Sequence, residues 1–231
     1  MTVPLGKHLA GNSKLSPRTP PYARYLVVRL ARPFPNFDLA FMKPLRQKAV
    51  RLLHLKHGDH VLDMGCGMGG SFPYLVDAVG PSGEVVGVEI SPEVTINTSR
   101  RIEKNSWRNV QVVEAAAQTV RLAGTFDGLL MFAAPDVYAS QEAVENIFPR
   151  LRENARVVVF GVKMSSNRLG RMLNPLLRMV VSKVSFPTTP SPDHEPWRLV
   201  AERLEEFEVE EYFFGLMFLG SGSAIRARKK P

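Results

Sequence analysis

A glycine-rich loop directly follows a short apolar run, and this pair constrains the fold more than any other feature of the sequence. Residues 60–64 read His-Val-Leu-Asp-Met, and residues 65–70 read Gly-Cys-Gly-Met-Gly-Gly. The apolar run predicts a buried strand, and the pattern at 72–79 predicts a helix after the loop. In open α/β sheets, ligands bind beyond the carboxyl ends of the strands, at such strand–loop–helix turns. The sequence therefore predicts a ligand site at this loop.

The alternation of strands and helices continues along the chain. Further strands are predicted over residues 84–90, 110–113, 126–132 and 157–162, and further helices over residues 44–56, 92–104 and 141–152. A loop that contains Pro135 and Asp136 follows the fourth strand. Strands that alternate with helices at this interval are joined by right-handed crossovers and form a parallel sheet covered on both faces. The predicted fold class is α/β, doubly wound and mostly parallel.

The C-terminal part of the chain departs from this alternation. A helix is predicted over residues 197–206, and extended runs follow at 209–214, 216–219 and 224–228, with a turn at Gly215. These runs lie too close together for a crossover helix. They therefore predict an antiparallel hairpin at the edge of the sheet.

Composition bounds the class of protein. The chain has 231 residues, 45% of them hydrophobic, which fits one main core. No stretch approaches the roughly 18 uninterrupted apolar residues that span a bilayer. Basic residues and prolines interrupt every apolar run near the start, so no secretory signal is expected. Cys66 is the only cysteine, which excludes an intrachain disulfide and a metal site built from clustered thiolates. We expect a cytoplasmic protein without a metal centre.

The formal net charge of +8 is concentrated in two segments. Residues 1–60 contain 11 Lys and Arg against two acidic residues. Residues 163–183 contain no acidic residue and alternate basic side chains with Leu and Met. Two interpretations of the second segment are open: a helix that packs its apolar side on the core, or a segment attracted to anionic lipid or to an anionic substrate.

Two acidic residues flank the glycine loop. Asp63 precedes the first glycine by two residues, and Glu89 lies at the end of the second predicted strand. The glycine spacing alone also fits a dinucleotide-binding loop. A carboxylate at 63 disfavours a pyrophosphate but suits the ammonium and sulfonium groups of S-adenosylmethionine, and Glu89 is placed to accept hydrogen bonds from ribose hydroxyls. A structural role for Asp63, capping N–H groups of the loop, stays open.

Residues 61–70 and 87–92 together resemble motif I and the second motif of class I S-adenosylmethionine-dependent methyltransferases. The likeness covers roughly residues 40–231, because residues 224–229 also resemble the final strand of that fold. It implies a Rossmann-like, mostly parallel seven-stranded sheet with a small cap, and S-adenosyl-L-methionine as the cofactor.

The resemblance also implies roles for individual residues by their positions in the motifs. Glu89 holds the ribose of the cofactor, and Ile90 packs on its adenine ring. The family often has an Asp after the third strand, where this chain has Ala116; the backbone N–H of Ala117 or the side chain of Gln118 would replace that contact. The predicted cofactor-binding residues are Asp63, Gly65, Cys66, Gly67, Gly69, Glu89, Ile90, Ala116, Ala117 and Phe132.

Methyl transfer from a sulfonium is an in-line displacement, so an enzyme of this family mainly holds acceptor, methyl carbon and sulfur in line. A general base is needed only if the acceptor must lose a proton. The sequence does not single one out. Candidates are Asp136 and Tyr138, after the fourth strand, and Tyr22 and Tyr25 in the N-terminal segment. A helix-capping or surface role for Asp136 is an equal alternative.

The class of acceptor is predicted from three segments. Residues 133–138 lack the pattern typical of enzymes that methylate exocyclic amines of nucleic acids, Asn or Asp followed by Pro-Pro-aromatic. Residues 165–196 occupy the place where small-molecule methyltransferases of this class build a substrate cap. Residues 167–177 and 214–220 resemble stretches of bacterial phospholipid and quinone methyltransferases. A basic and apolar cap suits a greasy acceptor with an anionic group.

We therefore expect an N-terminal arm or lid over residues 1–36 and a methyltransferase domain over 37–231, with the cap at 165–196. The expected acceptor is a lipophilic or aromatic small molecule, apolar or anionic, with peripheral contact to an anionic membrane. Three alternatives stay open: a nucleic-acid methyltransferase, which the basic charge would serve, an NAD-dependent oxidoreductase, and a cofactor-binding protein without catalysis. The sequence identifies neither the acceptor atom nor the oligomeric state.

Overall fold

The computed structural model describes residues 42–184 and 192–225. The predicted arm at 1–36, with Tyr22 and Tyr25, lies outside the described residues. The elements follow one another as α2 (Met42–Leu52), β1 (His60–Met64), α3 (Phe72–Val79), β2 (Glu84–Glu89), α4 (Pro92–Lys104), β3 (Val110–Glu114), β4 (Phe126–Phe132), α5 (Pro135–Tyr138), α6 (Gln141–Ile147), the 3-10 helix η2 (Phe148–Arg150), β5 (Leu151–Val162), α7 (Arg168–Val184), α8 (Arg198–Ala201), β6 (Leu204–Tyr212) and β7 (Met217–Ala224).

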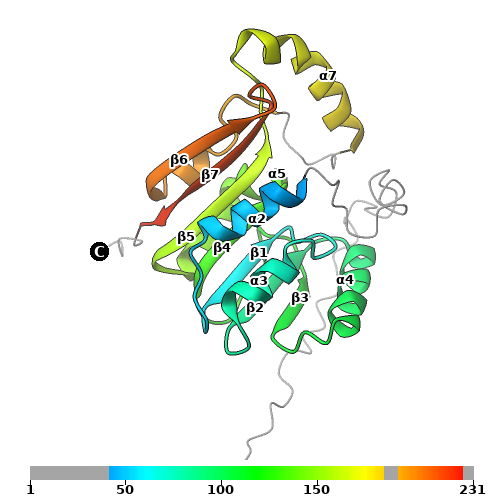
Figure 1. The fold of residues 1–231 in the computed structure, drawn as a ribbon, viewed down its shortest axis with the longest axis vertical. Helices are drawn as coiled ribbons and strands as arrows, with labels where there is room; N and C mark the ends of the chain where they lie inside the picture. The colour runs from blue at the N-terminus through cyan, green and yellow to red at the C-terminus, as the bar shows by residue number, and fades with distance from the viewer. Residues whose placement is uncertain (1–41, 185–191, 226–231) are drawn as a thin grey trace, which may run out of the picture.

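The strands form one seven-stranded sheet in the order β3-β2-β1-β4-β5-β7-β6 (Figure 1). Strands β1 to β5 pair in parallel, whereas β7 runs antiparallel to both β5 and β6. The predicted fold class, doubly wound and mostly parallel with an antiparallel C-terminal hairpin, is confirmed. Strand β1 lies between β2 and β4, so the glycine loop begins near the middle of the sheet.

Two hydrophobic cores cover the two faces of the sheet. One contains Ala49 of α2 and Leu75 of α3, and the other contains Val144 of α6 and Val200 of α8; all four side chains are buried. Because both faces are covered, the middle of β2 and most of β4 consist of buried apolar residues, as is typical of parallel strands.

Helix α2 is shorter than predicted. It ends at Leu52 rather than near residue 56, because His54 adopts a left-handed backbone conformation with φ of 52°. The predicted loop with Pro135 forms a short helix, α5, with this proline in its first turn.

Four boundaries in the second half of the chain were predicted wrongly. The helix predicted over 141–152 stops at Ile147, and β5 starts at Leu151 instead of 157, since Leu151 pairs with Phe126 of β4. The helix predicted over 197–206 is only α8, because Leu204 is buried and already pairs with β7. The run predicted at 216–219 and the start of the run predicted at 224–228 belong to one strand, β7, which ends at Ala224; residues 226–228 lie outside the described residues. Tertiary strand pairing overrides local helical pattern at these positions.

Phe72 links α3 to the sheet. Its ring is fully buried, lies edge-on to Trp107 with centroids 6.3 Å apart, and fills the space that the absent side chain of Gly87 leaves on β2. We predict that Phe72→Ala lowers the free energy of unfolding by about 3–5 kcal/mol, because it leaves a cavity in the core. Urea denaturation measures this loss. The control Ile96→Ala, at a side chain that is 51% exposed, should change stability by less than about 0.5 kcal/mol; equal losses in both variants would contradict the packing described.

Candidate functional site

The glycine loop turns sharply at the carboxyl end of β1. The N–H groups of Gly65 and Cys66 both donate to the carbonyl oxygen of Val88 on β2, at 2.9 and 3.1 Å. Gly65 and Gly67 have φ of 70° and 53°, in the left-handed region that favours glycine. A Cβ on Gly65 would lie 2.6 Å from the Cβ of Ala134, but a Cβ on Gly67 would meet no atom of the described chain within 4 Å. A side chain at position 65 would therefore clash with Ala134, whereas the backbone of Gly67 is open to an approaching ligand.

Glu89, the last residue of β2, holds the loop from the adjacent strand. Its Oε2 accepts a hydrogen bond from the N–H of Gly67 at 3.1 Å, and its Oε1 accepts one from the N–H of Ser91 at 2.9 Å. Burial raises the pKa of Glu89, the N–H group of Ser91 opposes this shift, and the nearby carboxylate of Asp136 adds to it. A carboxylate can accept about four hydrogen bonds. Glu89 therefore keeps capacity for the hydroxyl donors of a ligand.

Asp63, near the end of β1, is the most unusual group of the site. Its side chain is only 1% exposed, and its Oδ2 is buried without a hydrogen-bond partner among the described residues. Burial raises the pKa of Asp63 to about 7, although the guanidinium of Arg46 and the hydroxyl of Ser71 both oppose the shift. A buried acceptor without a partner is costly. This oxygen is therefore suited to a ligand that brings its own donor.

Four side chains that support the site were missed in the sequence analysis. Arg46 of α2 donates to the hydroxyl of Ser71 at 2.8 Å, and this pair lies beside Asp63. Thr98 of α4 donates to the carbonyl oxygen of Gly67 at 2.7 Å, and Arg101 donates to that of Met68 at 2.9 Å. Only Ser71, which directly precedes a predicted helix, carried a local signal. The others act across the tertiary structure.

Cys66 and Phe132 are predicted cofactor residues whose side chains pack against the protein. The thiol of Cys66 is buried next to Gly87, and burial raises its pKa, so the residue contributes its backbone to the loop. The ring of Phe132 stacks on Phe160 with centroids 4.3 Å apart, and the guanidinium of Arg46 lies 4.1 Å from its centroid.

The predicted adenine-side residues follow β2 and β3. Ile90 is half-buried directly after Glu89. The carbonyl oxygen of Ala116 accepts from the N–H groups of the next turn, and that of Ala117 accepts from the side-chain amide of Asn146 at 2.9 Å. Gln118 donates to the carbonyl oxygen of Asp136 at 3.2 Å and to the hydroxyl of Ser140 at 3.3 Å. Gln118 therefore ties β3 to the α5–α6 connection. The adenine contacts themselves stay predictions.

The two described base candidates differ in placement. Asp136 lies on α5, close enough to Glu89 for their charges to interact, and burial raises its pKa. Tyr138 is 1% exposed, packs edge-on to Phe218, and has its hydroxyl where a side chain on Gly161 would stand. This placement favours a packing role for Tyr138 and leaves Asp136 at the site.

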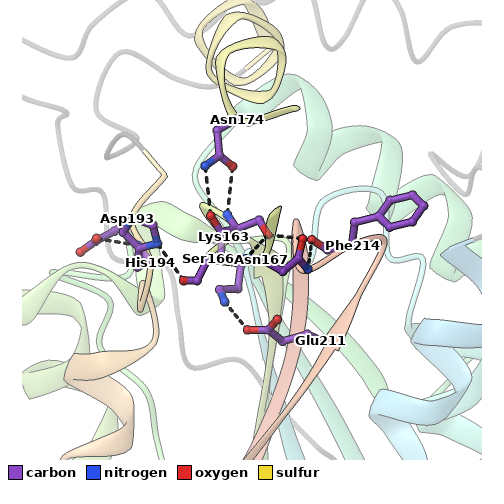
Figure 2. Close-up of polar contacts among 9 residues, drawn as sticks. Lys163, Ser166, Asn167, Asn174, Asp193, His194, Glu211 and Phe214 are labelled. Atoms are coloured by element: carbon purple, nitrogen blue, oxygen red, sulfur yellow. Dashed lines mark hydrogen bonds and ion pairs between the residues drawn. The ribbon is translucent and has the colours of Figure 1, made fainter. Parts of the chain in front are cut away.

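Ser166, His194 and Asp193 lie together near the start of α7 (Figure 2). The hydroxyl of Ser166 lies 3.3 Å from Nδ1 of His194, but Asp193 accepts a hydrogen bond from the backbone N–H of His194, at 2.6 Å. In a hydrolase triad the carboxylate orients the imidazole ring. These residues form a surface hydrogen-bond group without that geometry.

The residues around the loop fit S-adenosylmethionine. Asp63, Glu89 and Asp136 place three interacting carboxyl groups around it, in a chain whose net charge is +8. Such a site favours a cationic ligand and disfavours a pyrophosphate. The Oδ2 of Asp63 would take an ammonium donor, Glu89 would take hydroxyl donors, and the open backbone at Gly67 leaves room between them. The described residues contain no cluster of three His, Cys, Asp or Glu side chains arranged for a metal ion.

We predict that Asp63→Asn stabilises the cofactor-free protein at alkaline pH. The carboxyl has a pKa of about 7 when folded against an ordinary value of 3.8, so the folded state holds its proton over this window and the unfolded state does not. The free energy of unfolding of the wild type therefore falls as pH rises through the window, by at most about 4 kcal/mol, and the Asn variant escapes this loss. Urea denaturation at about pH 5 and about pH 8 measures the difference. If the difference in the free energy of unfolding between the Asp63→Asn variant and the wild type does not widen as pH rises, Asp63 is not a buried carboxyl with a raised pKa.

Residues 42–160 match the family model of protein-L-isoaspartate(D-aspartate) O-methyltransferase (PCMT), which covers just over half of the chain. A ubiquinone/menaquinone biosynthesis C-methyltransferase of Ectopseudomonas mendocina is 25% identical over 177 residues, 73% of this chain and 66% of the relative. Nocamycin O-methyltransferase of Saccharothrix syringae is 27% identical over 135 residues, 58% of this chain and 48% of the relative. The chain thus spans less than two thirds of the length of these relatives.

Among solved structures, an S-adenosylmethionine-dependent methyltransferase from Aquifex aeolicus superposes with a TM-score of 0.58 at 19% identity. The match covers 82% of this chain and all of that chain. This likeness shows the fold, and the family match includes the elements that carry Asp63, Glu89 and Asp136. The chain belongs to the PCMT family of class I S-adenosylmethionine-dependent methyltransferases.

Proposed function

We propose that this protein transfers a methyl group from S-adenosylmethionine to a lipophilic or aromatic small molecule of lipid or quinone type. One observation carries the first part: two buried carboxyl groups, Asp63 and Glu89, lie on either side of an open glycine loop, and one of their oxygens has no hydrogen-bond partner among the described residues. This arrangement complements a molecule with an ammonium, a sulfonium and two vicinal hydroxyls. A nicotinamide dinucleotide would bring its pyrophosphate to the same carboxylates.

The residues of the chain act by binding and orientation. When bound, S-adenosylmethionine supplies an electrophilic methyl group that a nucleophilic atom of the acceptor takes while the sulfonium becomes a neutral thioether. No covalent link to the protein is needed, and holding the reactants in line is worth about 7–11 kcal/mol. An acceptor that must lose a proton needs a base, and Asp136, whose pKa burial raises, is the described candidate at the site.

The proposed class of acceptor rests on the surroundings of the site. Helix α7 follows the carboxyl end of β5, and the glycine loop follows the carboxyl end of β1, so both lie at the same end of the parallel strands. Helix α7 exposes several Leu and Met side chains. Apolar side chains at the same end of the sheet as a methyl-transfer site favour a greasy acceptor. The quinone-pathway and nocamycin relatives are named for methylation of small molecules, which agrees with this class.

We predict that Asp63→Ala and Glu89→Ala each weaken binding of S-adenosylmethionine at least about tenfold. Each substitution removes hydrogen bonds to a charged group, worth about 1.5–3 kcal/mol. Isothermal titration calorimetry measures the dissociation constants. The control Asp77→Ala removes an exposed carboxylate from α3 and should leave affinity unchanged. Affinity that survives both site substitutions would exclude the proposed cofactor site.

The acceptor class is tested by incubating the protein with methyl-labelled S-adenosylmethionine and four separate pools: a lipid and quinone extract, an aqueous metabolite extract, an isoaspartyl peptide and total RNA. We expect label in the lipid and quinone pool. Heat-treated protein gives the background, and the Asp63→Ala variant shows that the label depends on the site. Label confined to the peptide would assign the reaction for which the PCMT family is named, and label confined to RNA would assign nucleic-acid methylation; either result would refute a lipophilic acceptor.

A further inference from the structure

Helix α7 carries an apolar stripe that faces solvent. Leu169, Met172, Leu173 and Leu176 follow the spacing of one helix face, and their side chains are 63%, 79%, 38% and 54% exposed. In a globular protein a stripe with this spacing normally faces the core and supplies most of the stability of the helix. Here the helix projects from the end of the sheet instead (Figure 1).

Polar contacts and a close backbone approach fix the first half of α7 to the protein. Asn167 caps the helix by accepting a hydrogen bond from the N–H of Gly170 at 2.7 Å. Asn174 bonds both the N–H and the carbonyl oxygen of Ser165, at 3.0 and 3.1 Å, and Figure 2 draws the two bonds of Asn174. A Cβ on Gly170 would lie 2.1 Å from the carbonyl oxygen of Phe214. Helix α7 is therefore held firmly by one side while its apolar stripe stays exposed.

The turn between β6 and β7 presents a second apolar group next to the start of α7. Phe213 and Phe214 have φ of 49° and 58°, a conformation that bulky side chains rarely adopt. The carbonyl oxygen of Phe214 accepts from the hydroxyl of Ser165 at 2.7 Å and from the amide of Asn167 at 2.6 Å, which fixes the turn. The ring of Phe214 points away from this polar group (Figure 2) and is 60% exposed. Backbone strain that holds an aromatic ring in solvent is typical of a binding feature.

The charge of α7 indicates what this surface binds. The helix contains no acidic residue, and Arg168, Arg171 and Arg178 are all exposed. Large exposed apolar patches on proteins mark sites of interaction with proteins or membranes. A helix with basic residues on one face and Leu and Met on the other is suited to the boundary between the headgroups and acyl chains of an anionic bilayer.

We propose that α7 and the β6–β7 turn form a docking surface for an anionic lipid bilayer. The apolar side chains of this surface enter the boundary between headgroups and acyl chains, while the arginines of α7 remain at the level of the phosphates. These apolar side chains, here called the α7 surface, are Leu169, Met172, Leu173, Leu176 and Phe214. A second copy of the chain is a poorer occupant, since pairing two α7 helices would bring together two sets of arginines without acidic partners on either helix. Docking would turn the carboxyl edge of the sheet toward the bilayer. The proposal does not depend on the methyl acceptor.

The test is co-sedimentation of the full chain with vesicles of phosphatidylcholine alone or of equal parts phosphatidylcholine and phosphatidylglycerol. We expect binding to the anionic vesicles that weakens with added salt. The variant Arg168→Gln, Arg171→Gln, Arg178→Gln should bind about tenfold to a hundredfold more weakly. The variant Met172→Gln, Leu176→Gln should bind the anionic vesicles at least about tenfold more weakly than the wild type, even at low salt.

Matched controls separate this surface from the net charge of the protein. The triple variant Arg100→Gln, Arg108→Gln, Arg121→Gln removes three exposed charges elsewhere, and Ile96→Gln, Ile225→Gln removes two exposed apolar side chains elsewhere. Both controls should bind vesicles as the wild type does, and all variants should keep wild-type circular dichroism and affinity for S-adenosylmethionine. Three results would each overturn the proposal. The first is an equal loss of vesicle binding in the controls and the α7 variants, and the second is no vesicle binding by the wild type. The third is a dimer, seen in sedimentation velocity, that only the Met172→Gln, Leu176→Gln variant disrupts.

Discussion

The buried carboxyl group of Asp63 is the interaction on which the site depends. The fold places it near the carboxyl end of the central strand β1, where its side chain is 1% exposed. One of its oxygens has no hydrogen-bond partner among the described residues. Burying a carboxyl in this way costs stability, and Arg46 and Ser71 only partly offset the cost. The cost is reasonable if a cationic ligand completes the site. The glycine loop, Glu89 and the contacts of α4 then serve to hold one edge of that ligand next to Asp63.

Charge is separated across the molecule in a way that matches two different partners. The carboxyl groups of Asp63, Glu89 and Asp136 gather around the glycine loop, where they suit a cation. The arginines of α7 lie on an exposed helix without acidic residues, where they suit an anion. The glycine loop follows the carboxyl end of β1 and α7 follows that of β5, two parallel strands that lie on either side of β4. Within the described residues no helix is both long and apolar enough to cross a bilayer.

Local pattern predicted the parts of the fold that local chemistry decides. Strands β1 and β4, helix α3 and the glycine loop lie where the sequence placed them, because apolar runs between turn residues leave few alternatives. Asp63 and Glu89 could be selected because both adjoin the ends of predicted strands. The start of β5, the short α8 and the partners Arg46, Thr98 and Arg101 were missed, since they depend on contacts between residues far apart in the sequence. The exposure of the α7 stripe could not be predicted either, because periodicity does not say what a helix face contacts.

The most direct test is a carbon-13 NMR titration of the Asp63 carboxyl group, assigned with the Asp63→Asn variant, without and with S-adenosylmethionine. We expect a pKa of about 7 in the free protein, raised by burial, and a clear fall on addition of the cofactor, because a cationic ligand favours the ionised carboxylate. An ordinary aspartate pKa in the free protein, or a pKa that the cofactor leaves unchanged, would contradict the account.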